Sequence, residues 1–595
     1  MRRGLFGLIS TAAIIATAAV GCTTGGGGSE DYDLPDIPGS DPTAKVMEFS
    51  LADYGPKDKA LLMVVNAGKD EKDVWGREVE YSVTYKTPTE LAKHEVEFNN
   101  ASSKDETGAR LTDDSGDVSV DYLCGYCESV EKFDALVRPG VDPDPSIVDP
   151  VAPHWDGKAV GTVAELYPPS VVSPTATSDD KIKVVKVLSD DETVKCNLLA
   201  QCNPEGQPVV STEICKEIAN SFGVGGSSIY GAVTKAFGNE WQYSPQGGLD
   251  GDTRVNIVIC DAAFMRGHGG AVRFCDCFKR SNVYTSNEGE YIFISTDLLV
   301  KEDGSWKTGV DQLLRGVLAH QLTHLIEMNN KVIREGAFTD FRLGETSARK
   351  AVETAGLSEG YAQLASDICG AGVAGAQDPH KGANAEALDD INLYLGGDSY
   401  FEDRSSDSSL VFPQSLFSRE QGNYSQGILG SSHMFMLYML KNFGLTTIGN
   451  MVQSSKIGTA NVTKYAKVNA DQIFSKYCRS VLLSQYAGLP ESDSFEYVKV
   501  NDINYVAAEG AISMASLPPY SALYTRDVKA GGDKFYMAPW TAKIVGFRGG
   551  KDADKSLVVD VEYPALGNVY MWRMNNDGSY SSEIIGVEKQ PHRDR

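Results

Sequence analysis

The chain has 595 residues, which is too long for a single hydrophobic core. Of these residues 42% are hydrophobic and 23% are charged, a composition typical of soluble globular proteins. Its formal net charge of −26 repels phosphate backbones and argues against nucleic acid as a partner. We expect roughly three or four folding units.

The first residues have the pattern of an export signal. Met1-Arg2-Arg3-Gly4 is a short basic start, and residues 5–20 are apolar and rich in alanine and isoleucine. The ending Ala19-Val20-Gly21-Cys22 resembles the lipobox of bacterial lipoproteins. That resemblance implies a signal peptide over 1–21, lipidation of Cys22 and a bacterial cell-envelope location, at the surface or in the periplasm. The alternative is a plain signal peptide followed by a chance cysteine. Residues 22–43, rich in glycine, proline and acidic side chains, predict a disordered tether.

Eleven cysteines are present, and ten remain when Cys22 is set aside. In an oxidising compartment outside the cytoplasm, disulfides are the default expectation, although their pairing cannot be deduced from sequence. The segment Cys124-Gly125-Tyr126-Cys127 follows no clear strand, so a local staple is favoured over a redox motif. A four-cysteine zinc site with Cys196 and Cys202 is a weaker alternative, because the spacing is irregular.

Strand and helix patterns divide the rest of the chain into three parts. Residues 44–175 show β patterns and predict an N-terminal β-sandwich-like domain. Residues 176–495 place strands first and helices afterwards, which predicts an α+β domain. Residues 496–595 return to β patterns and predict a C-terminal β-rich domain. The expected strands include 60–66, 79–85, 181–188, 193–200, 255–260, 290–295 and 556–563, and the expected helices 211–222, 310–329, 358–369, 431–443 and 470–484.

The strongest chemical signal is the segment Leu318-Ala319-His320-Gln321-Leu322-Thr323-His324. Two histidines four positions apart on a helix project from one face, so their imidazoles can reach one metal ion. The alternative is a pair of ordinary histidines on a core helix.

A zinc site needs a third protein ligand. Glu327 is nearly two helical turns, about 10 Å, from His320, which is too far to share one tetrahedral ion with both histidines. Glu359 is the better candidate, in the first turn of a helix that Ser358 could cap. Its alternative role is that of a solvated carboxylate at a helix N-terminus.

These motifs resemble the metal site of gluzincin metallopeptidases, most of all the hyicolysin-type neutral peptidases, over about residues 180–490. The family's H-E-x-x-H motif corresponds to His320 to His324, and Leu357-Ser358-Glu359-Gly360-Tyr361-Ala362 matches its later helix. The resemblance implies a gluzincin-like α+β domain with zinc as cofactor and His320, His324 and Glu359 as ligands.

The same resemblance implies further candidate roles. Related peptidases supply a tyrosine or histidine donor to the oxyanion, and Tyr424 and His433 lie in the matching region. Residues 269–274 are a candidate sheet edge for peptide binding by β-addition, with Cys275 and Cys277 expected as disulfide anchors. Asp367 is a candidate to orient a zinc ligand. Each of these polar residues has an ordinary packing or surface role as its alternative.

One position departs from the family. Gln321 stands where the family has the glutamate that takes a proton from the zinc-bound water and passes it to the leaving amine. Glutamine keeps the shape but cannot accept that proton, and loss of a general base typically costs about 10²–10⁴-fold in rate. Spacing gives no support to rescue by Glu327 or Glu345.

Three functions compete at this point. The first is an anchored zinc metalloendopeptidase-like protein impaired in hydrolysis. The second is a pseudopeptidase that binds envelope or host proteins, which Gln321 favours. The third is a structural lipoprotein without metal, against which His320, His324 and Glu359 argue. In each, membrane contact is expected through the lipid anchor only.

Overall fold

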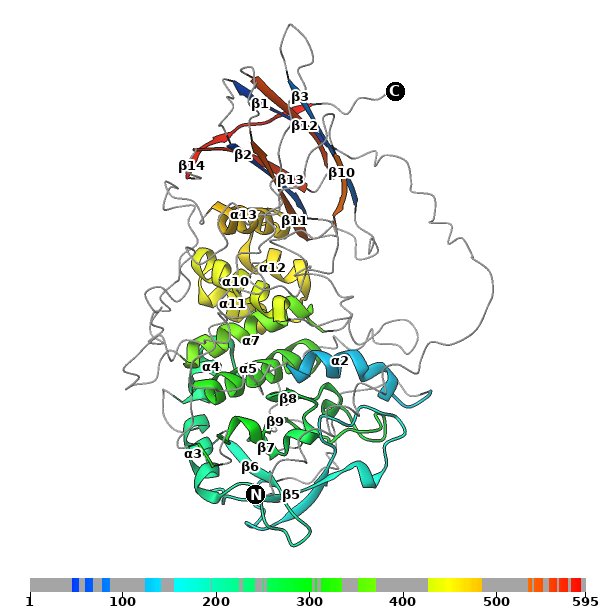
Figure 1. Cartoon of the computed structure of the whole chain (residues 1–595). Helices are drawn as coiled ribbons and strands as arrows, with labels where there is room; N and C mark the ends of the chain where they lie inside the picture. Colours follow the sequence, from blue (N-terminus) through cyan, green and yellow to red (C-terminus); the bar gives the residue numbers. More distant parts are fainter. Residues whose placement is uncertain are drawn as a thin grey trace, which may run out of the picture. The chain divides into compact units, whose positions relative to one another are not determined.

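A computed structural model of the chain describes residues 45–52, 59–67, 77–85, 124–140, 155–193, 195–223, 228–240, 250, 254–301, 305–307, 312–333, 352–370, 426–483, 533–537, 540–548, 556–563, 567–575 and 579–589. Helices and strands are mixed over this part of the chain, so the predicted α+β class is confirmed (Figure 1). The proposed lipidation site Cys22 and the tether lie outside the described residues.

Strands from both ends of the chain build two antiparallel sheets. Their strand orders are β10-β3-β12-β1-β15 and β11-β2-β13-β14. Phe49, Leu62, Val559 and Met571 are among the buried side chains that form one core between the two sheets. The strands are β1 (Lys45–Ala52), β2 (Lys59–Asn66), β3 (Arg77–Tyr85), β10 (Asp533–Met537), β11 (Thr541–Arg548), β12 (Ser556–Tyr563), β13 (Gly567–Met574), β14 (Tyr580–Ile584) and β15 (Val587–Lys589).

The prediction of separate N-terminal (44–175) and C-terminal (496–595) β domains therefore needs correction. Strand β12 pairs with both β1 and β3, and β2 pairs with both β11 and β13, so the two ends form one sandwich. Alternation of apolar residues shows which face of a strand is buried, but it does not show which distant strand is its partner.

A mixed six-stranded sheet forms the central sheet of the chain, in the order β4-β5-β6-β7-β9-β8. Strands β6, β7 and β9 run parallel, and β8 pairs antiparallel with β9 at one edge. Every residue of β7 is buried, as expected for a strand covered on both faces. The strands are β4 (Val163–Leu166), β5 (Ile182–Lys186), β6 (Cys196–Gln201), β7 (Val255–Cys260), β8 (Gly270–Val272) and β9 (Tyr291–Ser295).

The predicted boundary between the N-terminal and central domains at residue 175 is too late in the chain, as two elements show. Strand β4 pairs with β5 and so belongs to the central sheet. Helix α2 (Gly125–Leu136) lies against β8 and the 3₁₀ helix η3 (Phe274–Cys277) of the same domain. The central domain thus includes segments that the sequence patterns assigned to the N-terminal sandwich.

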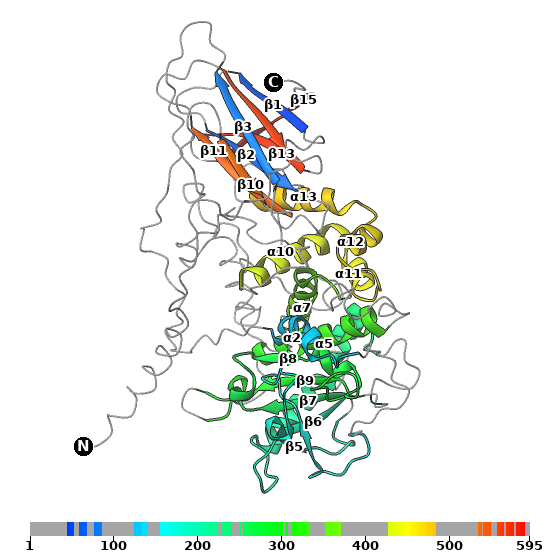
Figure 2. The ribbon, with the colours of Figure 1, turned by 90° about the vertical axis from the view of Figure 1, so that its right-hand side faces the viewer.

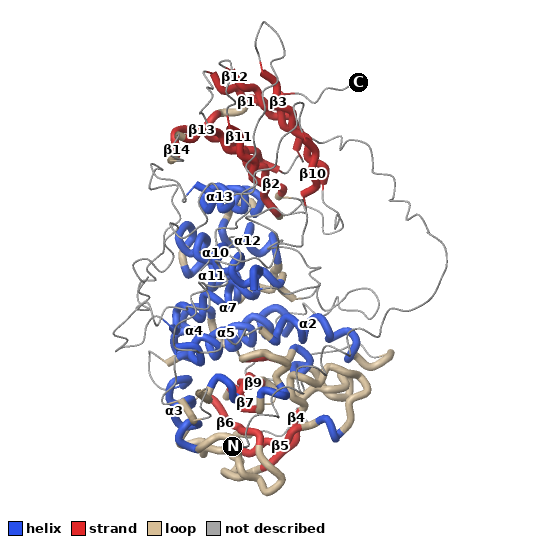
Figure 3. Tube along the Cα trace, in the orientation of Figure 1, coloured by secondary structure: helices blue, strands red, loops and turns tan. Residues whose placement is uncertain are grey.

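Between residues 312 and 483, every described regular element is helical (Figure 3). Helix α5 packs on β8, β9 and α7, and α10 packs on α7. Gly360 permits the close approach of α7 and α10, because a Cβ there would lie 2.9 Å from the Ser432 carbonyl oxygen. The helices in and before this region are α3 (Thr212–Gly223), α4 (Ile229–Phe237), α5 (Gln312–Met328), the π-helical turn η5 (Asn329–Ile333), α7 (Ala355–Gly370), α10 (Gln426–Phe443), α11 (Leu445–Val452), α12 (Gly458–Ala466) and α13 (Ala470–Leu483).

Among the residues that the structure describes, no helix has the length and apolar character needed to cross a membrane. Helix α10, which covers the apolar stretch near residue 435, instead buries Met434, Phe435 and Leu437 in the core of the central domain.

The nine cysteines whose side chains the structure describes are all free, so the expected disulfides do not form among them. Cys275 and Cys277 are buried in η3, where burial raises the pKa of the Cys275 thiol to about 12 and the pKa of Cys277 well above its usual value. The expectation of disulfide anchors at these two positions is therefore wrong, and so is the staple at Cys124, whose sulfur faces a histidine.

Candidate metal centre

Helix α5 presents two histidine rings to one point. His320 and His324 are four residues apart on α5, and their Nε2 atoms lie 3.0 Å from each other. His324 is fully buried and His320 is 8% exposed. Burial lowers the pKa of His324 to about 3; the Glu359 carboxylate opposes this shift and His320 adds to it. The ring is therefore neutral, which is the form that binds a metal.

Helix α7 brings a carboxylate to the same point. Glu359 Oε2 lies 3.2 Å from His320 Nε2, and Glu359 Oε1 lies 3.7 Å from His324 Nε2. The structure thus brings together the three residues that the sequence analysis chose as ligands. One detail differs: α7 begins at Ala355, so Ser358 lies inside the helix and does not cap it.

A fourth donor, which the sequence analysis did not predict, is Cys124. Its Sγ lies 3.3 Å from His324 Nε2, although the two residues are 200 positions apart in the chain. The donor atoms of Cys124, His320, His324 and Glu359 all lie within 4.8 Å of one another. The neighbouring Tyr126 stacks on the His324 ring, with 4.4 Å between ring centroids and 21° between planes.

The spacing of these four donors fits one tetrahedral ion. Four ligands at zinc distances of 2.0–2.3 Å lie about 3.3–3.8 Å apart at neighbouring corners of a tetrahedron. Four of the six donor separations are 3.0, 3.2, 3.3 and 3.7 Å, close to this range, and no two donors lie more than 4.8 Å apart. Two imidazole nitrogens, one carboxylate oxygen and one sulfur are also ligand types that zinc prefers, so the residues fit the metal.

Ser358 and Glu327 orient the His324 ring from its Nδ1 side, opposite the other candidate ligands. His324 Nδ1 lies 3.1 Å from Ser358 Oγ, and that hydroxyl donates to Glu327 Oε2 at 2.6 Å. While the hydroxyl donates to Glu327 it can accept the Nδ1 proton, which leaves the Nε2 lone pair directed at the other ligands. Burial and the nearby Glu353 raise the pKa of Glu327 to about 8, whereas Lys331 and the Ser358 hydroxyl oppose the shift. Glu327 thus supports a ligand and has no ligand role of its own.

Replacing Glu327 with glutamine is expected to weaken zinc binding by about 10–100-fold while leaving one binding site per chain. The carboxylate would no longer hold the Ser358 hydroxyl, so the tautomer and orientation of His324 would be less fixed. Competition with a chelator measures the affinity, and Glu192→Gln at an exposed carboxylate is the matched control. An unchanged affinity in Glu327→Gln would contradict this supporting role.

Gln321 lies between the edge strand and the new ligand. It is only 2% exposed, and its Nε2 donates to Cys124 Sγ at 3.6 Å. On the other side β8 approaches closely, because a Cβ on Gly270 would lie 3.0 Å from Gln321 Cγ. The Gln321 amide thus acts as a hydrogen-bond donor to a sulfur atom.

The remaining predicted site residues do not join this group. His433 is buried on α10 and its Nε2 makes a very short contact with Asp367 Oδ2 on α7. Asp367 is eight residues beyond Glu359 on α7, about 12 Å along the helix. Asp367 accordingly pairs with His433 and does not orient a ligand. Tyr424 and Glu345 lie outside the described residues.

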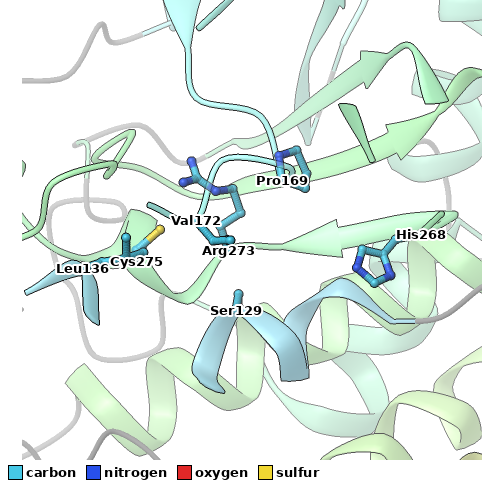
Figure 4. Close-up of a pocket in the computed structure, with 7 residues that line it drawn as sticks. All are labelled: Ser129, Leu136, Pro169, Val172, His268, Arg273 and Cys275. Atoms are coloured by element: carbon cyan, nitrogen blue, oxygen red, sulfur yellow. The ribbon is translucent and has the colours of Figure 1, made fainter. Parts of the chain in front are cut away.

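A small pocket also lies beside α2 (Figure 4). Ser129 of α2, Arg273 and Cys275 line it, together with Leu136, Pro169, Val172 and His268. None of these residues is one of the four candidate ligands. Arg273 is itself engaged by the Tyr167 carbonyl and the Asp276 carboxylate, so its role here is to hold the loops together.

Comparison with models of known protein families and with curated proteins finds no match to this chain. The assignment of function therefore depends on the geometry of the candidate metal centre.

Proposed function

We propose that the chain is an extracytoplasmic zinc protein, anchored through Cys22, whose metallopeptidase-like domain binds the metal without appreciable peptide hydrolysis. The observation that carries the proposal is the convergence of His320, His324 and Glu359 from two helices. The second supporting observation is that Gln321 lies beside these residues, at the position where a gluzincin peptidase has its general base.

The chemistry of these side chains supports metal binding and argues against turnover. A zinc ion held here would supply Lewis acidity and structural cross-linking of α5 and α7. Gln321 has an amide, which cannot take up a proton from an attacking nucleophile. The nearby carboxylate Glu327 is not one of the four donors, and it accepts from the Ser358 hydroxyl at 2.6 Å on the other side of His324.

The gluzincin-like identity of the domain is part of the same proposal. An edge strand, a helix with two histidines and a later helix with a glutamate follow one another as in that family. With hydrolysis impaired, the favoured role of the domain is to bind envelope or host proteins.

Metal analysis tests the proposal directly. Purified protein is expected to contain about one zinc per chain, and His320→Ala is expected to lose it, because the substitution removes one of the two imidazole ligands. His268→Ala, which changes a buried histidine outside the site, is the matched control and should retain the metal. Circular dichroism of each variant shows whether it is folded. Native protein without bound zinc, and with no affinity for added zinc, would contradict the proposal.

A further inference from the structure

Helix α2 begins at the metal centre. Cys124 is the residue immediately before its first turn, with extended backbone angles, and Tyr126 in that turn stacks on His324. The start of a helix favours negative charge, since backbone N–H groups there have no partner within the helix. Cys124 therefore presents its sulfur at the N-terminal end of α2, 3.3 Å from His324 Nε2.

Gln321 is chemically matched to that sulfur. A thiolate accepts hydrogen bonds, and the Gln321 amide donates one to Cys124 Sγ at 3.6 Å. An ionised glutamate at the same position would place a second negative charge against the sulfur in a buried site. The substitution that removes a general base thus supplies the group that a sulfur ligand needs.

The same helix covers the edge of the sheet. Ser129 Oγ accepts from the Phe274 N–H at 3.0 Å and lies 3.2 Å from the Val272 carbonyl oxygen, while its proton is shared between that carbonyl and the Tyr126 carbonyl at 2.6 Å. These are backbone groups that an added strand would use at an open sheet edge. Figure 4 shows Ser129 projecting from α2 toward this strand, and Figures 1 and 2 both show α2 beside α5 and β8. Farther along α2, Phe133 packs edge-on against Phe274.

We infer that Cys124 is the fourth zinc ligand and that α2 closes the centre. The Cys124 sulfur would fill the coordination position that a catalytic site leaves open, and Ser129 of α2 covers the β8 edge of the sheet. This inference depends on the proposed zinc site and adds a ligand to it. Four protein ligands are typical of structural zinc sites, whereas catalytic sites have three and leave the fourth position for water. The centre is therefore closed in the described state, and any peptide would have to displace α2 from both places.

Cobalt substitution tests the inference with a readout independent of activity. Wild-type protein loaded with one Co²⁺ per chain is expected to show a thiolate-to-cobalt charge-transfer band in the near ultraviolet. Cys124→Ser should lose this band while it still binds cobalt through His320, His324 and Glu359. Cys202→Ser, the same change at a buried cysteine outside the centre, should retain both cobalt and the band.

The outcomes separate the two proposals. Protein that binds no cobalt and no zinc would contradict the proposed function. Protein that binds one cobalt without the band, or a band that persists in Cys124→Ser, would overturn only the role of Cys124. As a second readout, zinc should protect Cys124 from alkylation, which peptide mass analysis would map. The other eight described thiols are buried, so they should react slowly with or without zinc. Equal alkylation of Cys124 with and without zinc would also overturn it.

Discussion

The double variant Cys124→Ala/Gln321→Glu is expected to cleave a short fluorogenic peptide about 10²–10⁴ times faster than Cys124→Ala alone. The alanine removes the sulfur from the fourth ligand position, and the glutamate supplies a group that can accept a proton. Gln321→Glu alone should stay as slow as the wild type. Cys124 still occupies the position in that variant, and a protonated glutamate can donate to its sulfur as the amide does.

Controls for this experiment come from the ligands themselves. Adding His324→Ala to the double variant should abolish the gain, since the cleavage would then depend on the metal centre. Cleavage by Gln321→Glu alone that equals the double variant would show that Cys124 does not close the centre. Robust wild-type cleavage that His324→Ala abolishes would refute the proposal of impaired hydrolysis.

The second large effect is expected on stability, at a buried ion pair behind the centre. Lys331→Met should lower the free energy of unfolding by about 3–5 kcal/mol, because it leaves Glu353 as a buried charge without its cation. Lys331 Nζ lies 3.2 Å from Glu353 Oε2, and both side chains have no exposed surface. Lys331 also donates to the carbonyls of Met451 and Lys456, so it joins the end of α5 to the segment around α11.

Urea unfolding measures this effect, and a second substitution separates its causes. Glu353→Gln added to Lys331→Met should recover part of the loss, since glutamine has the shape of glutamate without its charge. Lys216→Met is the matched control, because Lys216 and Glu192 form an exposed pair that should contribute little. A Lys331→Met protein as stable as this control would contradict the structural role of the pair.

The three predicted ligands illustrate what local patterns can establish. Two histidines four apart define a helix face, and a short glutamate motif completes the set by resemblance. The structure places their donor atoms 3.0–3.7 Å apart. Regular segments were predictable for the same reason: the strand expected at 255–260 is β7, and the helix expected at 470–484 is α13.

Cys124 could not be identified as a ligand in this way. It is 200 positions from His324, and a Cys-x-x-Cys spacing in a chain expected to be exported favours a disulfide over a metal ligand. Its role depends on tertiary contacts, above all the stacking of Tyr126 on His324 and the bonds of Ser129 to the β8 edge. The joint sandwich was missed for a related reason, because β1 and β12 pair across most of the chain.

His433 has a partner that the sequence did not predict. It lies in the segment that resembles the family's later helix, which made it a candidate oxyanion donor. In the structure it is a core residue whose Nε2 pairs with Asp367, more than two helical turns from Glu359. The resemblance of this segment predicted that it forms a helix, α10. The neighbours of each side chain on that helix depend on how α7 and α10 pack together.

X-ray absorption at the zinc edge of the native protein is the most direct measurement of the coordination described here. We expect one sulfur at about 2.3 Å and three nitrogen or oxygen ligands at about 2.0–2.1 Å from the metal. A shell of nitrogen and oxygen alone, with a water-like fourth ligand, would contradict it.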